Sequence, residues 1–196
     1  VLEGQWQITL RESSDTWNKI ADGKYQLTLM SDSPGTIKYF LNTSKHKIAW
    51  LNSVSIEGEM SSPVSALSDA NMSSFGILIG DKAVIDPSKG LRIRARLTSS
   101  GIRFQVDTMT TGSWTQQYAT EYGTTKSMLW KVTLENNTLK VYFDVGKTGS
   151  WEEVYSTQDF FGNKLLYISL WAASSSSDEE TYTMDYIHVS YPDFSI

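Results

Sequence analysis

The sequence has no cysteine, two histidines and four prolines among its 196 residues. The absence of cysteine excludes disulfide bonds and thiolate metal sites. Neither His46 nor His188 lies near a candidate nucleophile, so a Ser-His-Asp triad and a histidine-rich metal site have little support. All four prolines fall in segments that we interpret as loops.

Long apolar runs are missing too. Without about 18 consecutive apolar residues, the chain is not expected to insert into a membrane. The N-terminus lacks a basic-then-apolar export signal, which is typical of a mature or excised module. With 17 basic and 22 acidic residues, the net charge of -5 would repel a phosphate backbone, so nucleic acid is a poor candidate partner.

What is present favours strands and turns. Aromatic residues make up 12% of the chain, and serine, threonine, glycine and asparagine are frequent. Apolar and polar residues alternate in roughly twelve segments at the spacing of a β-sandwich. The clearest are 6–10, 25–29, 37–41, 54–60, 75–79, 91–97, 102–106, 128–134, 139–145, 165–171 and 182–190. Tight hairpins are expected at Glu135–Thr138 and Ser99–Gly101.

No linker divides the chain and no segment has helical periodicity. We therefore predict one domain over residues 1–196, an all-β, two-sheet antiparallel β-sandwich of the jelly-roll kind.

Three segments carry a family resemblance. Val141-Tyr142-Phe143-Asp144, the strand Leu166–Ala172 and the closing strand Met184–Val189 resemble the concanavalin A-like lectin/glucanase superfamily. The resemblance covers about the last half of the chain by pattern and the rest by strand count. It implies two curved sheets, with carbohydrate bound on or beside the concave face in many members, among them non-catalytic binding modules.

The glycosidases of this superfamily share a strand with the pattern Glu-x-Asp-x-x-Glu, because a nucleophile and an acid must lie about 5–5.5 Å apart. The nearest match places Glu59 where the pattern has aspartate and Ser62 where it has the second glutamate, after Glu57. The motif is broken. The alternative is a solvated strand face, paired with the stripe formed by Arg92, Arg94 and Arg96.

Aromatic residues provide the candidate sugar-binding surface, because flat rings stack on the apolar faces of sugars. If Leu166, Ile168 and Leu170 face inward, Tyr167, Ser169 and Trp171 form an exposed row on the opposite face. Trp114 and Trp151 follow matching Thr-Gly-Ser turns, and Tyr118 follows Trp114, so these rings either stack on sugar from loops or cap the rim. The polar partners expected on outward faces are Arg103, Gln105, Asp107 and Asp144.

The type of sugar depends on which sheet holds each strand. An aromatic groove favours neutral glycans, whereas the arginine stripe favours uronic acids if it lies on the concave face. Pattern alone leaves this choice open.

A structural calcium ion is a further expectation, because hard cations need only clustered oxygen atoms. Asp185 is the candidate ligand, together with Glu3 if the terminal strands pair. The acidic run Asp178–Glu180 is the other candidate, and its alternative is a solvated loop.

Taken together, these features favour a non-catalytic carbohydrate-binding module that recognises a polysaccharide by stacking and hydrogen bonds. We expect it to be secreted or at the cell surface, with other modules of a larger secreted protein as possible partners. Two alternatives stay open. One is a glycoside hydrolase or polysaccharide lyase of the same fold that requires Glu57 and Glu59, and the other is a structural or adhesive surface domain.

Overall fold

The computed structural model describes residues 6–13, 17–31, 33, 35–49, 53–62, 67–68, 71–162 and 164–191. Fifteen β-strands lie within these ranges, all paired antiparallel. Over the same ranges the structure contains no helix suited to crossing a membrane. The predicted all-β, two-sheet antiparallel sandwich is confirmed.

The eight-stranded sheet runs in the order β1 (Trp6–Arg11), β4 (Lys38–Ser44), β14 (Leu165–Ser174), β7 (Met72–Gly80), β8 (Lys89–Thr98), β9 (Gly101–Thr110) and β10 (Ser113–Glu121), with β5 (Ile48–Ala49) paired to β14. The seven-stranded sheet runs in the order β13 (Glu152–Gln158), β12 (Thr138–Val145), β11 (Ser127–Glu135), β6 (Val54–Ser61), β15 (Glu180–Ser190), β3 (Lys24–Leu29) and β2 (Trp17–Ala21).

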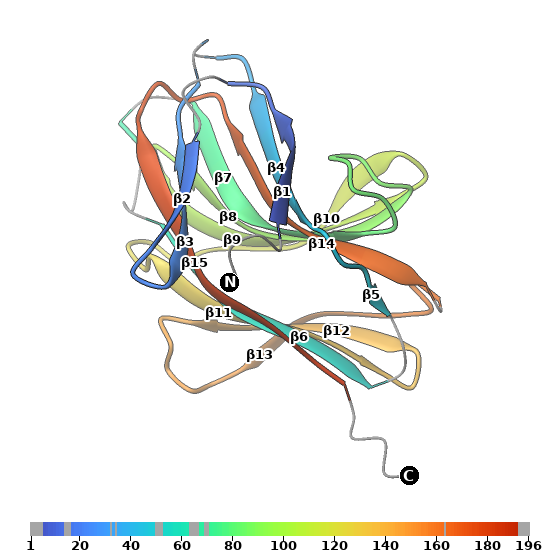
Figure 1. Ribbon diagram of the computed structural model, residues 1–196. Coiled ribbons are helices and arrows are strands. Elements are labelled where there is room, and N and C mark those ends of the chain that lie inside the picture. The colour runs from blue at the N-terminus through green and yellow to red at the C-terminus, as the bar shows by residue number, and fades with distance from the viewer. Residues whose placement is uncertain are drawn as a thin grey trace.

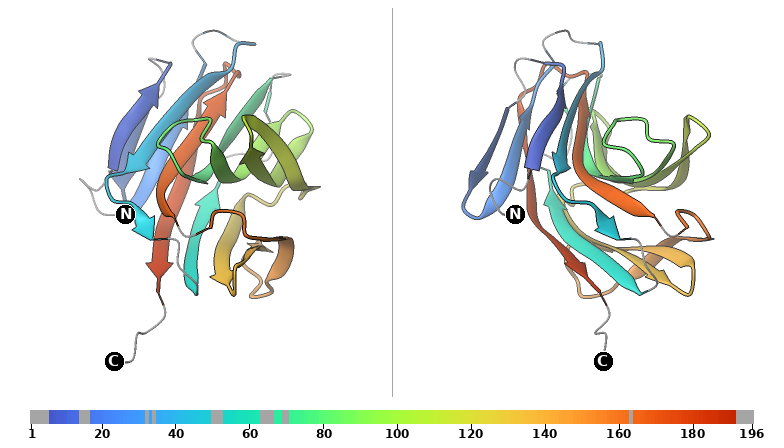
Figure 2. Two further views of the ribbon diagram at one scale, coloured as in Figure 1. Left: turned by 90° about the vertical axis from the view of Figure 1, so that its right-hand side faces the viewer. Right: turned by 45° about the vertical axis from the view of Figure 1, so that its right-hand side comes forward.

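Both sheets are strongly bent, and the seven-stranded sheet wraps around the convex side of the other (Figure 1). The opposite face of the eight-stranded sheet is therefore hollowed. At one edge of that face β10 folds upward, with the loop between β7 and β8 beside it (Figure 2). We call this side the concave face.

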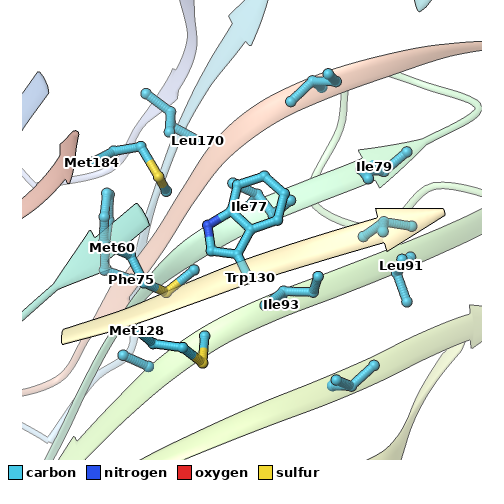
Figure 3. Close-up of a cluster of buried hydrophobic side chains, with 14 of the residues drawn as sticks. Met60, Phe75, Ile77, Ile79, Leu91, Ile93, Met128, Trp130, Leu170 and Met184 are labelled. Carbon is cyan, nitrogen blue, oxygen red and sulfur yellow. The ribbon is translucent and has the colours of Figure 1, made fainter. Parts of the chain in front are cut away.

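The core lies between the sheets and is built around Trp130, which is fully buried among methionine, phenylalanine and aliphatic side chains (Figure 3). Gly58 of β6 makes room for the indole. A Cβ atom at position 58 would lie 2.5 Å from Trp130 Cζ2 and 2.5 Å from the carbonyl oxygen of Tyr186. Only glycine fits this close approach of backbone and ring.

Both expected hairpins form. Asn136 and Asn137 adopt positive φ angles of 49° and 62° between the paired Glu135 and Thr138. In the other hairpin Thr98 pairs with Gly101. Asparagine and glycine tolerate these conformations at little cost, so the turns fix the register of both strand pairs.

Four strands, β2, β5, β10 and β13, fall outside the alternating segments found in the sequence. We interpreted the regions of β10 and β13 as loops and assigned no strand to the regions of β2 and β5. Both β10 and β13 are largely exposed or half-buried along their length. An edge strand buries few side chains, so its sequence does not alternate clearly.

Two buried tyrosines make stability sensitive to alkaline pH. Burial raises the pKa of Tyr25 and of Tyr182 above the usual 10.0. Asn42 Nδ2 donates to Tyr25 Oη at 2.9 Å, and Tyr182 Oη donates to Ser73 Oγ at 2.8 Å. Above pH 10 the folded state keeps phenolic protons that the unfolded state loses, so the free energy of unfolding falls as pH rises.

Urea denaturation at pH 9 and pH 11 measures this fall. In the Tyr182→Phe variant the fall should be smaller, because one of the retained protons is gone. An equal fall in the variant and the wild type would contradict the assignment to Tyr182.

Candidate functional site

The concave face is a regular grid, because strand register aligns its outward-facing residues in rows across β14, β7, β8 and β9. The three central rows are Ser169, Leu78, Arg92 and Asp107; then Trp171, Gly76, Arg94 and Gln105; then Ala173, Ser74, Arg96 and Arg103. The arginine stripe of β8 therefore runs down the middle of the concave face. This resolves the sheet assignment that the sequence left open.

Arg92 lies between two tryptophan rings. Its guanidinium carbon is 4.2 Å from the ring centre of Trp114 and 4.4 Å from that of Trp171. Such stacking favours a cation on the electron-rich ring faces. The Trp114 indole N–H donates to Asp86 Oδ1 at 2.9 Å, which holds this ring over β8. A Cβ atom at Gly90 would lie 3.1 Å from Trp114 Cη2, so glycine leaves space for the ring there.

Asp107 is the acidic partner of the stripe, and it is 2% exposed. Arg92 Nε donates to Asp107 Oδ2 at 3.0 Å, and Arg94 Nε lies 2.9 Å from the same oxygen in an ion pair. The Arg94 contact has the distance but not the angle of a hydrogen bond. Burial lowers the pKa of Arg92, and it lowers the pKa of Arg94 to about 10.

Arg96 differs from its two neighbours on β8. No ion pair or hydrogen bond joins it to any residue that the structure describes, and its Nε atom is buried without a partner. Its cross-strand neighbour on β9 is another cation, Arg103, which forms an ion pair with Glu121. Arg96 thus forms no ion pair within the described part of the chain, although Glu121, the partner of Arg103, lines a second pocket beside it.

A pocket of about 250 Å³ opens over this stripe. Its walls include three aromatic and three cationic side chains, namely Tyr39, Trp114, Trp171, Arg92, Arg94 and Arg96. The buried Trp171 indole N–H has no acceptor. The pocket therefore combines ring faces with two N–H donors, Arg96 Nε and Trp171 Nε1, that the described residues leave without an acceptor. Of its three guanidinium groups, two form ion pairs with Asp107 and the third forms none within the described ranges.

Tyr167, Ser169 and Trp171 all point away from the core, as predicted. The prediction that they form an exposed row is wrong. Trp171 and Ser169 are each 1% exposed, and only Tyr167 is half-buried. The curvature of the sheet brings Arg92 and Arg94 over the indole of Trp171. Strand parity gives the direction of a side chain but not what covers it.

The expected polar partners are mostly used within the protein. Gln105 and Asp107 lie on the concave face but are buried, and Gln105 Nε2 donates to Gln116 Oε1 at 2.7 Å. Asp144 is also buried. It accepts hydrogen bonds from the backbone N–H groups of Thr148 and Gly149, both at 2.8 Å, and so closes the turn before Trp151.

The structure does not bring Trp151 and Tyr118 to the pocket. Trp151 precedes β13 of the seven-stranded sheet, where Lys131 Nζ lies 4.5 Å from its ring centre. Tyr118 of β10 packs against the main core, with its ring centre 5.8 Å from that of Phe143. Tyr118 therefore has a packing role, which corrects its placement on a loop.

Tyr39 is a pocket residue that the sequence pattern did not single out. The alternation of Ile37, Tyr39 and Leu41 indicated one face of a strand, but it did not show which one. In the structure Phe40 faces the core, whereas Tyr39 and Leu41 pack with Trp171 on the concave face. Both faces of this strand are apolar, so periodicity could not distinguish them.

Glu57 and Glu59 lie on β6, in the other sheet from the arginine stripe, so the expected pairing with that stripe is wrong. Glu59 is 7% exposed and forms an ion pair with Lys147. Glu57 Oε1 lies 3.7 Å from His188 Nδ1. Each carboxylate therefore has its own neighbouring basic group.

The candidate calcium ligand Asp185 forms an ion pair with Lys24 at 2.9 Å, while Glu3 lies outside the described residues. In the acidic run, Asp178 accepts hydrogen bonds from the backbone and hydroxyl of Ser68. No group of three or more acidic or histidine side chains within the described ranges is arranged to hold a metal ion. Calcium binding stays a prediction.

No protein-family model and no curated protein matches the sequence. Solved structures do match. A legume lectin-like domain from Entamoeba histolytica gives a TM-score of 0.66 at 11% identity over 95% of this chain and 90% of that chain. The carbohydrate-binding module CBM66 from Bacillus subtilis gives 0.55 at 12% identity over 94% of both chains.

A xylan β-1,4-xylosidase from Bacillus halodurans C-125 gives a TM-score of 0.64 at 13% identity. The match covers 96% of this chain but 37% of the xylosidase, so the chain spans little more than a third of that enzyme's length. At these identities the likeness shows the fold. It confirms the predicted two-sheet β-sandwich, a fold shared with lectin-like domains, and the function must be argued from the pocket.

Proposed function

We propose that this domain binds a saccharide, without transforming it, in the pocket of the concave face. The observation that carries the proposal is the combination of ring faces and unused N–H donors around one recess. Sugars present apolar C–H faces bordered by hydroxyl groups, so they need both kinds of contact. The lectin-like and carbohydrate-binding neighbours support the same class of ligand.

Tyr39 is the ring best placed to stack on a sugar. It is half-buried, whereas Trp171 is almost fully covered. Its ring centre lies 6.3 Å from that of Trp171, so the two rings form a continuous aromatic wall. The volume of about 250 Å³ is just below the range of about 300–1,000 Å³ that holds drug-sized ligands, which suits one or two sugar rings.

The ligand would be a polysaccharide or oligosaccharide outside the cell, and the domain one module of a larger secreted or surface protein. A small pocket gives weak affinity, which tethering to other modules raises through effective concentration. The xylosidase supports this arrangement, because a sandwich like this one occupies part of its longer chain.

Affinity electrophoresis against a panel of neutral and acidic polysaccharides tests the proposal, with reducing-end release measured in the same samples. Retardation without release is expected. The Tyr39→Ala variant should bind at least about tenfold more weakly, which corresponds to about 1.4 kcal/mol of lost stacking and burial.

Tyr142→Ala is the matched control, because Tyr142 is also half-buried but lies on β12 of the other sheet. It should bind as the wild type does. Release of reducing ends would replace the proposal with an enzymatic function, and no retardation by any polysaccharide would overturn it.

A further inference from the structure

We infer that the saccharide bound in this pocket is anionic, and that Arg94 and Arg96 hold its carboxylate or sulfate group. This inference rests on the proposed function and adds the chemical class of the ligand. It is based on an imbalance of charge inside the pocket, on the geometry of its donors and on the overall charge of the chain.

The first argument is charge. Arg92, Arg94 and Arg96 all line the pocket, and the one carboxylate paired with them is Asp107. Asp107 is already shared by Arg92 and Arg94, which leaves Arg96 without an acidic partner in the described ranges. Arg96 is half-buried, and a partly desolvated charge without an ion-pair partner is costly unless something else compensates it. A ligand anion supplies that compensation.

The second argument is geometry. Arg94 and Arg96 are two residues apart on one strand, so their side chains emerge from the same face about 7 Å apart. The planar fork of a guanidinium group matches the two oxygen atoms of a carboxylate or sulfate. Arg96 Nε is buried without a hydrogen-bond acceptor, whereas Arg94 Nε lies 2.9 Å from Asp107 Oδ2.

The Trp171 indole N–H adds an independent observation. Trp171 is 1% exposed, it lines the same pocket, and its nitrogen has no acceptor. Buried polar groups are almost always satisfied by a partner, so a donor left over beside two guanidinium groups indicates a missing acceptor. Two donors without an acceptor, Arg96 Nε and Trp171 Nε1, therefore belong to residues that line the same pocket.

The third argument is the overall negative charge of the chain, which confines attraction of an anion to the arginine-lined pocket. The chain carries a net charge of -5, so its surface as a whole repels a polyanion. Attraction to an acidic saccharide must then come from the local excess of arginine, and it should fall as salt is added because the ligand's charge is partly screened.

Isothermal titration calorimetry with the whole chain tests the inference on pairs of ligands that differ only in charge. The pairs are polygalacturonate with its fully methyl-esterified form, and dextran sulfate with dextran. We expect the charged member of at least one pair to bind tenfold or more tightly than its neutral partner. The first pair reports a carboxylate and the second a sulfate, and preference in either supports the inference.

Two Arg96 variants and one control locate the charge. Arg96→Gln should lose at least tenfold in affinity for the acidic ligand, and Arg96→Lys should recover only part of it because lysine lacks the planar fork. Lys140→Gln removes the same charge from β12 on the other sheet, where Lys140 pairs with Glu153, and it should bind as the wild type does. Thermal melts confirm that each variant folds.

Several outcomes would overturn the inference. Neutral ligands bound as tightly as acidic ones would leave saccharide binding standing but remove the anionic class. Equal losses in Arg96→Gln and Lys140→Gln would place the charge dependence outside the pocket. Binding of single-stranded DNA through Arg96 with no saccharide bound would overturn both proposals, as would the absence of binding to every ligand.

Discussion

Replacing Asp107 with asparagine is expected to lower the free energy of unfolding by about 3–5 kcal/mol, the cost of breaking a buried ion pair from one side. The variant keeps the size of the side chain but removes the charge that Arg92 and Arg94 share. Their side chains are only 9% and 11% exposed, so water cannot replace the lost carboxylate. Urea denaturation at neutral pH measures the change.

Glu121→Gln is the matched control for Asp107→Asn. Its ion pair with Arg103 joins neighbouring strands of the same sheet, but the two side chains are 54% and 38% exposed. Exposed pairs contribute less than about 1 kcal/mol. If the two variants lost equal stability, Asp107 would not hold the arginine stripe together.

Replacing Trp171 with alanine is expected to lower the free energy of unfolding by about 3–5 kcal/mol, as for other large-to-small changes at buried aromatic residues. The loss has two parts. Removal of the buried indole leaves a cavity beside Tyr39, Leu41 and Leu78. The Arg92 guanidinium group also loses one of the two tryptophan rings that it contacts. Saccharide binding should weaken as well, because the pocket loses its floor.

Trp151→Ala serves as the comparison, since this tryptophan is 39% exposed and contacts Lys131 on the other sheet. It should lose less than about 1 kcal/mol, the value of an exposed cation–π contact. Trp171→Phe should recover part of the stability by keeping an aromatic ring. A Trp171→Ala variant as stable as Trp151→Ala would contradict the structural role of the stack.

The fold was predictable because its signals are local. Alternation of apolar and polar residues depends only on the two-residue repeat of a strand, so segments such as 102–106 and 139–145 marked both their conformation and their buried faces. The asparagine pair at 136–137 marked a hairpin for an equally local reason, its tolerance of positive φ. Edge strands were missed where burial, and with it the pattern, is weak.

The candidate site was only partly predictable. Parity correctly gave the side of the strand from which Trp171, Gln105 and Asp107 project. It could not give their exposure, which depends on the curvature of the sheet and on the long arginine side chains that cover it. Trp151 follows the same Thr-Gly-Ser turn as Trp114, and Tyr118 follows Trp114 along the chain. Yet the structure places Tyr118 against the core and Trp151 before an edge strand of the other sheet.

The sequence by itself determined the all-β sandwich, most of its strands and turns, and the existence of an arginine stripe on one face of 91–97. Only the tertiary structure decided where that stripe lies and what surrounds it. The order β14-β7-β8-β9-β10 joins Trp171, the arginines, Asp107 and Trp114, which are far apart along the chain. Strand order is set by packing between distant segments, and no local pattern records it.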